Sequence, residues 1–366
     1  MTDRRRERVR VVLDASPLRD ARRDAGIGRY VAQLIEALRA IQDLDLRLAS
    51  PRRSGPDSWV KRFLYAQPTV IRRAVTSRAE LVHAMASDPV LGWPTSRQVV
   101  TVHDVAPWTT HLPPEGTYTR RYLDFQRPRF ARCAAVIAVS EIVADETAAV
   151  LAVPRAKITV VPEGVAEGFS ERAAGTDEAA RARAGASEAG YILWVGSLRS
   201  HDPRKAIDDL VAAVAALGPA APPLVLAGRT GEEAGRIGRL ASEAGVPVVM
   251  PGYVDDATLA ALYRGAGIVA VPSRHEGFGL TALEAMACGA PVVASTGGNL
   301  SALGDAAVLV EPGDRAALGR AIRSVLDDPA LATRLRTAGL AYASKFSWKR
   351  AAHQTAEVYR RIRSRR

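Results

Sequence analysis

The fold and the candidate site of this chain are read most directly from residues 273–291, which run Ser-Arg-His-Glu-Gly-Phe-Gly-Leu-Thr-Ala-Leu-Glu-Ala-Met-Ala-Cys-Gly-Ala-Pro. The preceding residues 267–272, Gly-Ile-Val-Ala-Val-Pro, predict a buried β-strand that ends at a proline. Residues 280–288 are rich in alanine and leucine without a helix breaker, and Gly-Ala-Pro at 289–291 ends them. The stretch therefore predicts a strand, a glycine-containing turn and a helix, in that order.

Two glutamates lie eight positions apart in this stretch, Glu276 in the turn and Glu284 about one turn into the helix. Backbone N–H groups at a helix start can hold a phosphate or a sugar hydroxyl, so the two carboxylates can contact different parts of one ligand. A capped helix with a solvated acid is the alternative, and it would be preferred for a lone glutamate. The length of the whole string favours a ligand site.

The string resembles the donor-site signature of the retaining, nucleotide-sugar-dependent glycosyltransferases of the GT-B fold, in the large family 4 (glycosyltransferase group 1). The resemblance extends across nearly the whole chain, with a departure at Thr281, where the family usually has proline. It implies that Glu276 contacts hydroxyls of the donor sugar and that Glu284 binds the ribose of the nucleotide. It also implies donor contacts from the turn between them, Gly277, Phe278, Gly279 and Leu280.

The composition favours two globular domains. A chain of 366 residues with 48% hydrophobic content can bury two cores. No run of 18 apolar residues is present, so no spanning helix is expected, and the charged N-terminus has no signal-peptide apolar region. The two cysteines, Cys133 and Cys288, have neither the number for a disulfide framework nor metal-ligand spacing. We therefore expect a cytoplasmic protein, with peripheral attachment to the inner face of the membrane as an extension of that expectation.

The net charge of +11 is concentrated in a few places. Residues 1–10 carry a net charge of +3 and residues 360–366 one of +5, whereas residues 169–359 have 19 basic and 20 acidic side chains. Residues 52–78 contain seven bases and one acid, and residues 120–132 contain five bases and one acid. Because no base-reading module or aromatic–basic interleaving accompanies the arginine-rich ends, nucleic acid is not expected as a partner.

Continuous apolar runs separated by helical patterns predict two parallel sheets buried on both faces. The expected strands are residues 9–13, 46–49, 81–84, 98–102 and 134–139 in the first half, and 191–195, 223–227, 247–250, 268–271 and 291–294 in the second. We expect an α/β protein with two Rossmann-like doubly wound domains facing a central cleft. Residues 1–168 would bind the acceptor and residues 169–345 the donor. The stretch 169–189 is the linker candidate, and by resemblance the helix 346–366 packs back on the first domain.

A second candidate donor loop follows the strand at 191–195, from Gly196 to Lys205. A glycine after a strand lets backbone approach phosphate, and a basic side chain before the next helix can neutralise a leaving diphosphate. The loop resembles the glycine–basic–lysine diphosphate motif of the family, lengthened by residues 200–202. Lys205 is the first choice for the cation, Arg204 the second and Arg199 the third, and a solvated loop base is the alternative for each.

Gly26-Ile-Gly28, placed between the first strand and its helix, resembles the family loop beside the donor diphosphate. No third glycine follows at the spacing of a dinucleotide fingerprint, so NAD binding is not expected. His103 ends the strand 98–102, and the matching histidine of the family faces the donor sugar, although a structural hydrogen-bonding role is also open. Asp104, next to it, is either an acceptor contact or a helix cap.

Three further positions complete the expected site. Tyr253 and Val254 match the base-contact region of the family, in which backbone atoms read the edge of the nucleotide. Ser140 is expected to cap the helix that begins at Glu141. Glu163 stands where relatives often have asparagine, which leaves its polar role open. Neither the Asp43-Leu-Asp45 spacing nor any histidine, cysteine or carboxylate cluster indicates a metal site.

The resemblance implies a metal-independent, retaining hexosyltransferase that needs no cofactor and uses a nucleoside diphosphate sugar. GDP-mannose is favoured slightly over UDP-glucose or an N-acetylated sugar. In this interpretation Glu276, Lys205, His103 and Arg204 carry the chemistry. The acceptor is a glycan, a lipid-linked molecule or a phosphate-bearing molecule.

The basic segments of the first half are candidates for contact with an anionic acceptor or an anionic membrane surface. Arg62, Arg72 and Arg73 are the candidate contacts in the first of these segments. Apolar side chains interleave with the bases in residues 59–71. A solvated face above ordinary core contacts is the alternative.

Three rival functions are weighed against this interpretation. A nucleotide-sugar epimerase of the same fold would need further acid–base groups beside the sugar, and none is identified. A phosphorylase would usually carry a pyridoxal lysine in a much longer chain. From another class, a nucleic-acid-binding protein is motivated by the arginine-rich ends alone.

Overall fold

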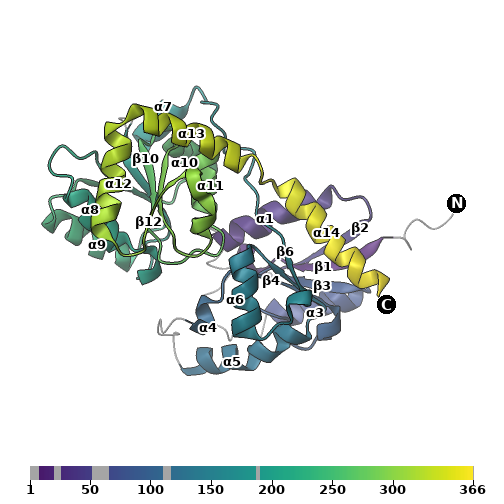
Figure 1. Cartoon of the computed structure of the whole chain (residues 1–366). Helices are drawn as coiled ribbons and strands as arrows, with labels where there is room; N and C mark the ends of the chain where they lie inside the picture. Colours follow the sequence, from purple (N-terminus) through teal and green to yellow (C-terminus); the bar gives the residue numbers. More distant parts are fainter. Residues whose placement is uncertain (1–7, 20–25, 52–65, 110–116, 187–189, 366) are drawn as a thin grey trace. The chain divides into compact units, whose positions relative to one another are not determined.

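The computed structural model of the chain describes residues 8–19, 26–51, 66–109, 117–186 and 190–365. It divides into two compact units, Met1–Gly164 together with Ser347–Arg366, and Val165–Phe346 (Figure 1). Among the described residues, each unit contains a six-stranded sheet with parallel strand pairs and helices on both faces. The expected pair of doubly wound α/β domains is confirmed.

The first unit has the strand order β2-β1-β3-β4-β5-β6. Its strands are β1 (Val9–Asp14), β2 (Leu44–Ala49), β3 (Leu81–Ala84), β4 (Gln98–Val102), β5 (Ala135–Ala138) and β6 (Ile158–Val160). Its helices are α1 (Gly26–Arg39), α3 (Gln67–Thr76), α4 (Ala106–Thr109), α5 (Thr117–Arg132), α6 (Glu141–Leu151) and α14 (Trp348–Ser364), with short 3-10 helices at Ser16–Arg19, Thr95–Arg97 and Arg155–Lys157.

The second unit has the strand order β12-β11-β10-β7-β8-β9. Its strands are β7 (Ile192–Val195), β8 (Leu224–Ala227), β9 (Val248–Gly252), β10 (Ile268–Val271), β11 (Val292–Ser295) and β12 (Val308–Val310). Its helices are α7 (Asp177–Arg183), α8 (Ile207–Ala215), α9 (Glu232–Glu243), α10 (Asp256–Gly265), α11 (Leu280–Ala287), α12 (Arg315–Asp327) and α13 (Pro329–Ala343), with 3-10 helices η6 (Pro203–Lys205) and η7 (Asn299–Ala306).

Apolar side chains of the second sheet pack alternately against helices on its two faces. Leu193 of β7 belongs to a core cluster with α10 and α11, while its neighbours Ile192 and Trp194 belong to a second cluster with α8, α9 and α12. This alternation is the two-residue period of a strand, and burial on both faces explains why the strands are continuously apolar.

The order of the strands determines where each unit can bind a ligand. In the second sheet, β7 lies beside β10, although β8 and β9 follow β7 in the chain. Such a reversal of strand order is a topological switch point, and ligands of open α/β sheets bind there, beyond the carboxyl ends of the strands. The first sheet has its switch point between β1 and β3.

Two strands and the linker candidate depart from the sequence-based expectations. The short strands β6 and β12 were not predicted, and both lie at sheet edges. The linker candidate 169–189 was not expected to contain regular structure, but it contains the helix α7. Asp177 of this helix forms an ion pair with Arg264 of α10, at 2.6 Å between Oδ2 and Nε.

The last helix of the chain, α14, packs against α1 in the first unit. Gly26 and Gly28 are the first and third residues of α1, so the motif lies in the first turn of the helix and, contrary to the expectation, Gly26 is not in a loop before it. Ser347 caps α14, and Trp348 at its start packs against Tyr30 of α1, with ring centroids 5.7 Å apart. The chain therefore returns to the first unit through its last helix.

Candidate donor site at the switch point of the second unit

Two loops leave the second sheet at its switch point. Residues 196–206 follow β7, and residues 272–279 follow β10 and lead into α11. Gly279 takes a left-handed conformation (φ +90°) before the first residue of the helix, Leu280, and glycine adopts this conformation without strain. The predicted strand, turn and helix around residues 273–291 are confirmed.

Lys205 and Glu276 join the two loops. The Lys205 ammonium Nζ lies 2.8 Å from Glu276 Oε1, and the Ser273 hydroxyl donates to the same carboxylate oxygen at 2.7 Å. Burial raises the pKa of Glu276, but Lys205 and Ser273 outweigh this effect and leave the pKa below its ordinary value. Burial likewise lowers the pKa of Lys205, and Glu276 outweighs it and raises the pKa. Both groups are therefore charged at neutral pH.

Backbone contacts hold the Glu276 turn against its neighbours. The Arg274 N–H donates to the Arg204 carbonyl at 2.7 Å, and the Glu276 N–H donates to the Gly297 carbonyl at 3.3 Å. The backbones approach so closely that a Cβ on Gly297 or Gly298 would overlap the turn. The carboxylate is thus presented by a turn that is braced from both adjacent loops.

The other two basic candidates of the first loop differ from Lys205. The Arg204 guanidinium is bound on two sides by the Asp202 carboxylate, at 3.0 and 2.9 Å, so that much of its charge is compensated inside the loop. Asp202 also accepts the Arg204 N–H and starts the 3-10 helix η6. Arg199 is exposed. Gly196 lies against Gly228, where a Cβ would overlap the Gly196 carbonyl.

Glu284 is the most buried acid of the expected site. Its exposed fraction is 2%, and it accepts a hydrogen bond from the Tyr263 hydroxyl of α10 at 3.3 Å. A carboxylate so far from solvent is costly unless polar groups or a ligand compensate it.

The remaining residues of the turn anchor it to its surroundings. Phe278 packs against Phe346, with centroids 5.8 Å apart, and its carbonyl accepts from the Asn299 side chain at 2.8 Å. A Cβ on Gly279 would lie 2.9 Å from Leu300. Gly277 is half-buried between Glu276 and Phe278.

The expected base-contact region follows β9. Tyr253 is 52% exposed, and the Arg229 guanidinium lies 5.1 Å from the centre of its ring. Val254 packs against the core, and Asp255 caps α10 by accepting the Thr258 N–H. An exposed aromatic ring with an arginine above it can stack with a planar base.

In the first unit, His103 follows the end of β4 and is 10% exposed. Its Nε2 donates to the Met85 carbonyl at 3.0 Å, and its Nδ1 lies 3.3 Å from Glu163 Oε1. Its ring packs edge-on against Tyr30, with centroids 4.5 Å apart. Glu163, whose polar role the sequence left open, is therefore the partner of His103. Because the two residues are far apart in the chain, no local sequence pattern indicated this contact.

Two polar residues of the first unit, Asp104 and Ser140, lie at helix starts. Asp104 Oδ1 accepts the Ala106 N–H at 3.0 Å at the start of α4, which is the geometry of a helix cap. Ser140 caps α6 by accepting the Val143 N–H, as expected.

Of the basic residues proposed to contact the acceptor, Arg72 and Arg73 are exposed on α3, whereas Arg62 lies outside the described residues.

The part of the chain that the structure describes contains no group of three histidine, cysteine or acidic side chains arranged to hold a metal ion. In the same residues, no helix is both long and apolar enough to cross a membrane.

Two family models match the chain. "Glycosyltransferase Family 4" matches residues 25–168, and "Glycosyl transferases group 1" matches residues 189–328. The two matches correspond to the two units of the structure. The chain belongs to the group 1, family 4 glycosyltransferases of the GT-B fold.

Individual proteins agree with this assignment. The chain is 36% identical over 246 residues to a D-inositol 3-phosphate glycosyltransferase of Streptomyces avermitilis, which covers 60% of this chain and 52% of the relative. It is 36% identical over 178 residues to the O-antigen chain mannosyltransferase B of Escherichia coli, which covers 47% of this chain and 46% of the relative. These matches therefore span about half the length of the curated relatives.

Among solved structures, the sucrose-phosphate synthase of Thermosynechococcus elongatus superposes with a TM-score of 0.81 at 26% identity. The superposition covers 98% of this chain and all of that one.

Proposed function

We propose that this protein transfers a hexose from a nucleoside diphosphate sugar to an acceptor with retention of anomeric configuration. The observation that carries the proposal is the Lys205–Glu276 pair, 2.8 Å apart at the switch point of the second unit. The pair lies at the carboxyl ends of β7 and β10, where an α/β sheet binds its ligand. It also lies within the part of the chain that matches the group 1 model.

Each charged group of the pair has a separate role in this proposal. Lys205 stabilises the negative charge that develops on the leaving diphosphate, because a preorganised cation in a partly buried site needs no reorganisation during the reaction. Glu276 binds hydroxyls of the donor sugar. Arg204, Arg199 and the Gly196 backbone are secondary contacts to the diphosphate.

Nucleotide recognition is assigned to the elements on either side of the pair. Glu284 binds the ribose with its carboxylate, which the Tyr263 hydroxyl orients by a hydrogen bond of 3.3 Å. Backbone N–H groups of residues 277–280, at the start of α11, are assigned to phosphate or sugar oxygens. Tyr253 and Val254 contact the base.

His103 is assigned to the sugar end of the donor, with Glu163 as its partner. Because Nε2 donates to the Met85 carbonyl and Nδ1 faces Glu163, a sugar hydroxyl must replace or share one of these hydrogen bonds. Gly26 and Gly28 remain assigned to the diphosphate through the start of α1.

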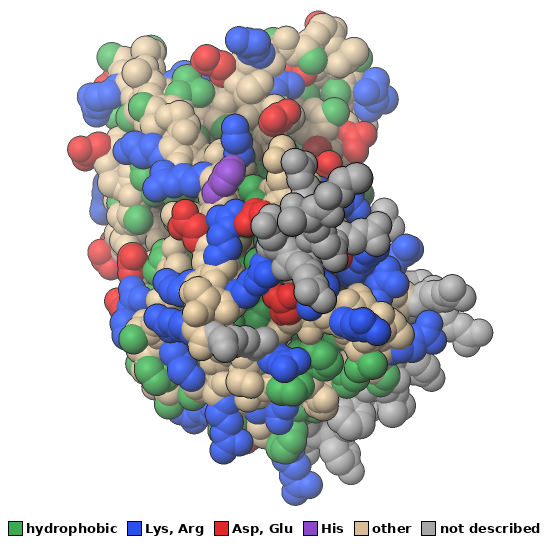
Figure 2. Space-filling model, turned by 90° about the vertical axis from the view of Figure 1, so that its right-hand side faces the viewer, with side chains coloured by type: hydrophobic (Ala, Val, Ile, Leu, Met, Phe, Trp, Pro, Cys, Tyr) green, Lys and Arg blue, Asp and Glu red, His purple; other side chains and the backbone are tan. Residues whose placement is uncertain are grey.

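The acceptor is proposed to bind to the first unit and to carry negative charge. The related D-inositol 3-phosphate glycosyltransferase has, by its name, a phosphate-bearing acceptor. In this chain the exposed Arg72 and Arg73 of α3 supply positive charge, and Lys and Arg side chains are numerous on the face drawn in Figure 2. A glycan, a phosphate-bearing small molecule and a lipid-linked acceptor at an anionic membrane surface are all compatible with this charge, and Asp104 is a weaker acceptor contact.

The donor is proposed to be GDP-mannose, followed by UDP-glucose and UDP-linked N-acetylhexosamines. The mannosyltransferase among the relatives supports this order. The test is incubation with a panel of nucleotide sugars and measurement of the released nucleoside diphosphate, with NMR of the product to assign the anomer. Release from one or a few donors with a retained anomer is expected. An inverted product would overturn the retaining mechanism, and conversion of the sugar without nucleotide release would indicate an epimerase.

A further inference from the structure

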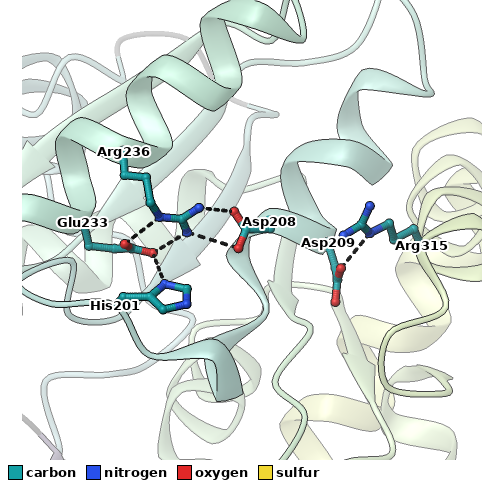
Figure 3. A network of polar contacts seen from close by, with 6 residues as sticks. All are labelled: His201, Asp208, Asp209, Glu233, Arg236 and Arg315. Atoms are coloured by element: carbon teal, nitrogen blue, oxygen red, sulfur yellow. Dashed lines mark hydrogen bonds and ion pairs between the residues drawn. The ribbon is translucent and has the colours of Figure 1, made fainter. Parts of the chain in front are cut away.

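Two consecutive aspartates on the first turn of α8 form ion pairs in different directions (Figure 3). Asp208 binds Arg236, which also binds Glu233, and Glu233 in turn accepts from His201. Asp209 lies away from this network. It is bound by Arg315 at the start of α12, with 2.7 Å between Nε and Oδ1.

The second partner of Asp209 belongs to the candidate site. Arg274 Nη2 lies 2.7 Å from Asp209 Oδ2, and Arg274 is two residues before Glu276 in the turn after β10. The Asp209 side chain is only 5% exposed, so its charge is compensated almost entirely by the two guanidinium groups. Charge-assisted hydrogen bonds of this kind are short and directional.

The Arg274 side chain and backbone fix the turn at the same residue. The backbone N–H bonds to Arg204 of the Lys205 loop, while the side chain reaches α8. Gly313 leaves room for the guanidinium, because a Cβ there would lie 3.0 Å from Arg274 Nη1. Arg274 therefore connects the Glu276 turn, the Lys205 loop and α8, the helix that follows that loop.

We propose that Asp209 and Arg274 are a positioning pair that holds the Glu276 carboxylate in its reactive place. The proposal rests on the function proposed above. A site group that must lie within about 0.5 Å of its productive position needs surrounding groups that fix its backbone. Asp209, on a regular helix whose side chains fill the core of the second unit, supplies a fixed point that the turn by itself lacks.

Arg315 provides a matched control, because it binds the same carboxylate at the same distance but does not belong to the turn. If Asp209 only joined α8 to α12, loss of Arg315 would matter as much as loss of Arg274. If Asp209 acts through the turn, loss of Arg274 matters and loss of Arg315 does not. Arg274 and Arg315 are 49% and 60% exposed, and each variant leaves the other guanidinium on the Asp209 carboxylate, so the two substitutions should cost similar folding stability.

The experiment compares Arg274→Gln, Arg315→Gln and Arg274→Lys in the full-length protein. Arg274→Gln should lower kcat about tenfold, since small misplacement of a reacting group is costly, and change the Kd of the nucleoside diphosphate less than about twofold. Arg315→Gln should keep kcat within about twofold of wild type, and Arg274→Lys, which restores the charge, should recover part of the loss. Equal loss in the two glutamine variants, or no loss in Arg274→Gln, overturns the proposal.

A second measurement does not depend on turnover. Hydrogen–deuterium exchange of a peptide covering residues 273–279 should be faster in Arg274→Gln than in wild type and unchanged in Arg315→Gln, because the Arg274 and Glu276 amides are hydrogen-bonded in the braced turn. If wild-type protein consumes no nucleotide sugar, the proposed function fails and this comparison still decides the positioning role. Equal exchange in the three proteins overturns it.

Discussion

At the scale of single residues, the candidate site separates acids and bases that look equivalent in the sequence. Lys205 and Arg204 are neighbours, yet Lys205 binds Glu276 and Arg204 binds Asp202 of its own loop. Glu276 and Glu284 belong to the same stretch of sequence. The Glu276 carboxylate is half-buried and forms an ion pair with Lys205, whereas the Glu284 carboxylate is buried and accepts a hydrogen bond from the Tyr263 hydroxyl. These different surroundings predict different effects of substitution.

The two glutamates should have distinct binding signatures. Glu284→Ala should weaken nucleoside diphosphate binding by about 1.5–3 kcal/mol, the loss expected for a hydrogen bond to a charged group. Glu276→Ala should leave this binding nearly intact and reduce turnover, because its ligand is the sugar. Isothermal calorimetry with the nucleoside diphosphate, together with initial rates, measures both. Equal losses of nucleotide affinity in the two variants would contradict the division of roles.

Lys205 should matter more than its neighbour. Lys205→Ala should lower kcat by about 10²–10³-fold, as when a donor to a developing anion is removed. Arg204→Gln should have a smaller effect, because Asp202 already compensates the guanidinium charge. Steady-state rates with and without a chelator complete the test. A strict requirement for a divalent ion would show that a metal and not a fixed cation stabilises the leaving group.

At the scale of secondary-structure elements, a buried polar network attaches the last helix to the first sheet. His83 of β3 contacts the Tyr359 hydroxyl of α14 at 2.6 Å through Nδ1, and the Thr101 hydroxyl of β4 at 2.8 Å through Nε2. The Tyr30 hydroxyl of α1 contacts the same threonine at 2.9 Å. Because the histidine is completely buried, both of its nitrogens need these partners.

Removal of one hydroxyl from this network should destabilise the fold. Tyr359→Phe leaves a buried histidine nitrogen without a partner and should cost about 1–3 kcal/mol of unfolding free energy, measured by urea denaturation. Tyr253→Phe, which removes a hydroxyl from a tyrosine that is 52% exposed, is the control and should change stability by less than about 0.5 kcal/mol. A similar stability of both variants would show that the network contributes nothing.

The same network should make stability depend on pH. Burial, with a smaller contribution from His103, lowers the pKa of His83 from 6.5 to about 3. Between these values the unfolded chain binds a proton that the folded protein does not bind, so stability is complete above about pH 6.5 and falls as the pH decreases toward 3. Urea titrations at pH 7.5 and pH 5 should show this loss in wild type and a smaller one in His83→Gln. An identical pH dependence in both proteins would exclude His83 as its source.

At the scale of the whole molecule, the internal basic segments and most of the candidate donor contacts belong to different units. The assigned contacts to the diphosphate, ribose and base lie mostly in the second unit, Val165–Phe346, which has 17 basic and 20 acidic side chains, while the internal basic segments 52–78 and 120–132 belong to the first. Of these segments, α3 exposes Arg72, Arg73 and the apolar Val75, and α5 exposes Phe125. Such a mixture of bases and apolar side chains suits a lipid headgroup surface or an anionic acceptor.

Charge removal should separate membrane attachment from donor chemistry. Replacement of Lys61, Arg62, Arg72 and Arg73 by glutamine should abolish co-sedimentation with anionic vesicles, since each base near such a surface contributes about 1 kcal/mol. Hydrolysis of the donor should be unchanged, because none of these four residues is assigned to the donor. Lys61 and Arg62 lie outside the described residues, so the experiment also tests their part of the segment. Wild-type protein that ignores anionic vesicles at low salt would leave only the anionic acceptor as the partner of this charge.

The sequence by itself determined the two doubly wound domains, because buried parallel strands are recorded as continuous apolar runs and the donor turn as a local string of glycines and acids. It did not reveal β6 and β12, which are three residues long and lie at sheet edges with one neighbour each. Nor did it reveal the helix α7 inside the linker candidate, which is held by an ion pair between Asp177 and Arg264, 87 positions away.

Only the tertiary structure decided which candidate groups act on one another. Glu163 meets His103 across 60 positions, Lys205 meets Glu276 across 71, and Asp209 meets Arg315 across 106. The hydrophobic period and the composition of a segment indicate only the place of each residue within its own helix or strand. The pairing of charges depends on which strand ends the sheet order brings together, and that order is set by the packing of the whole unit.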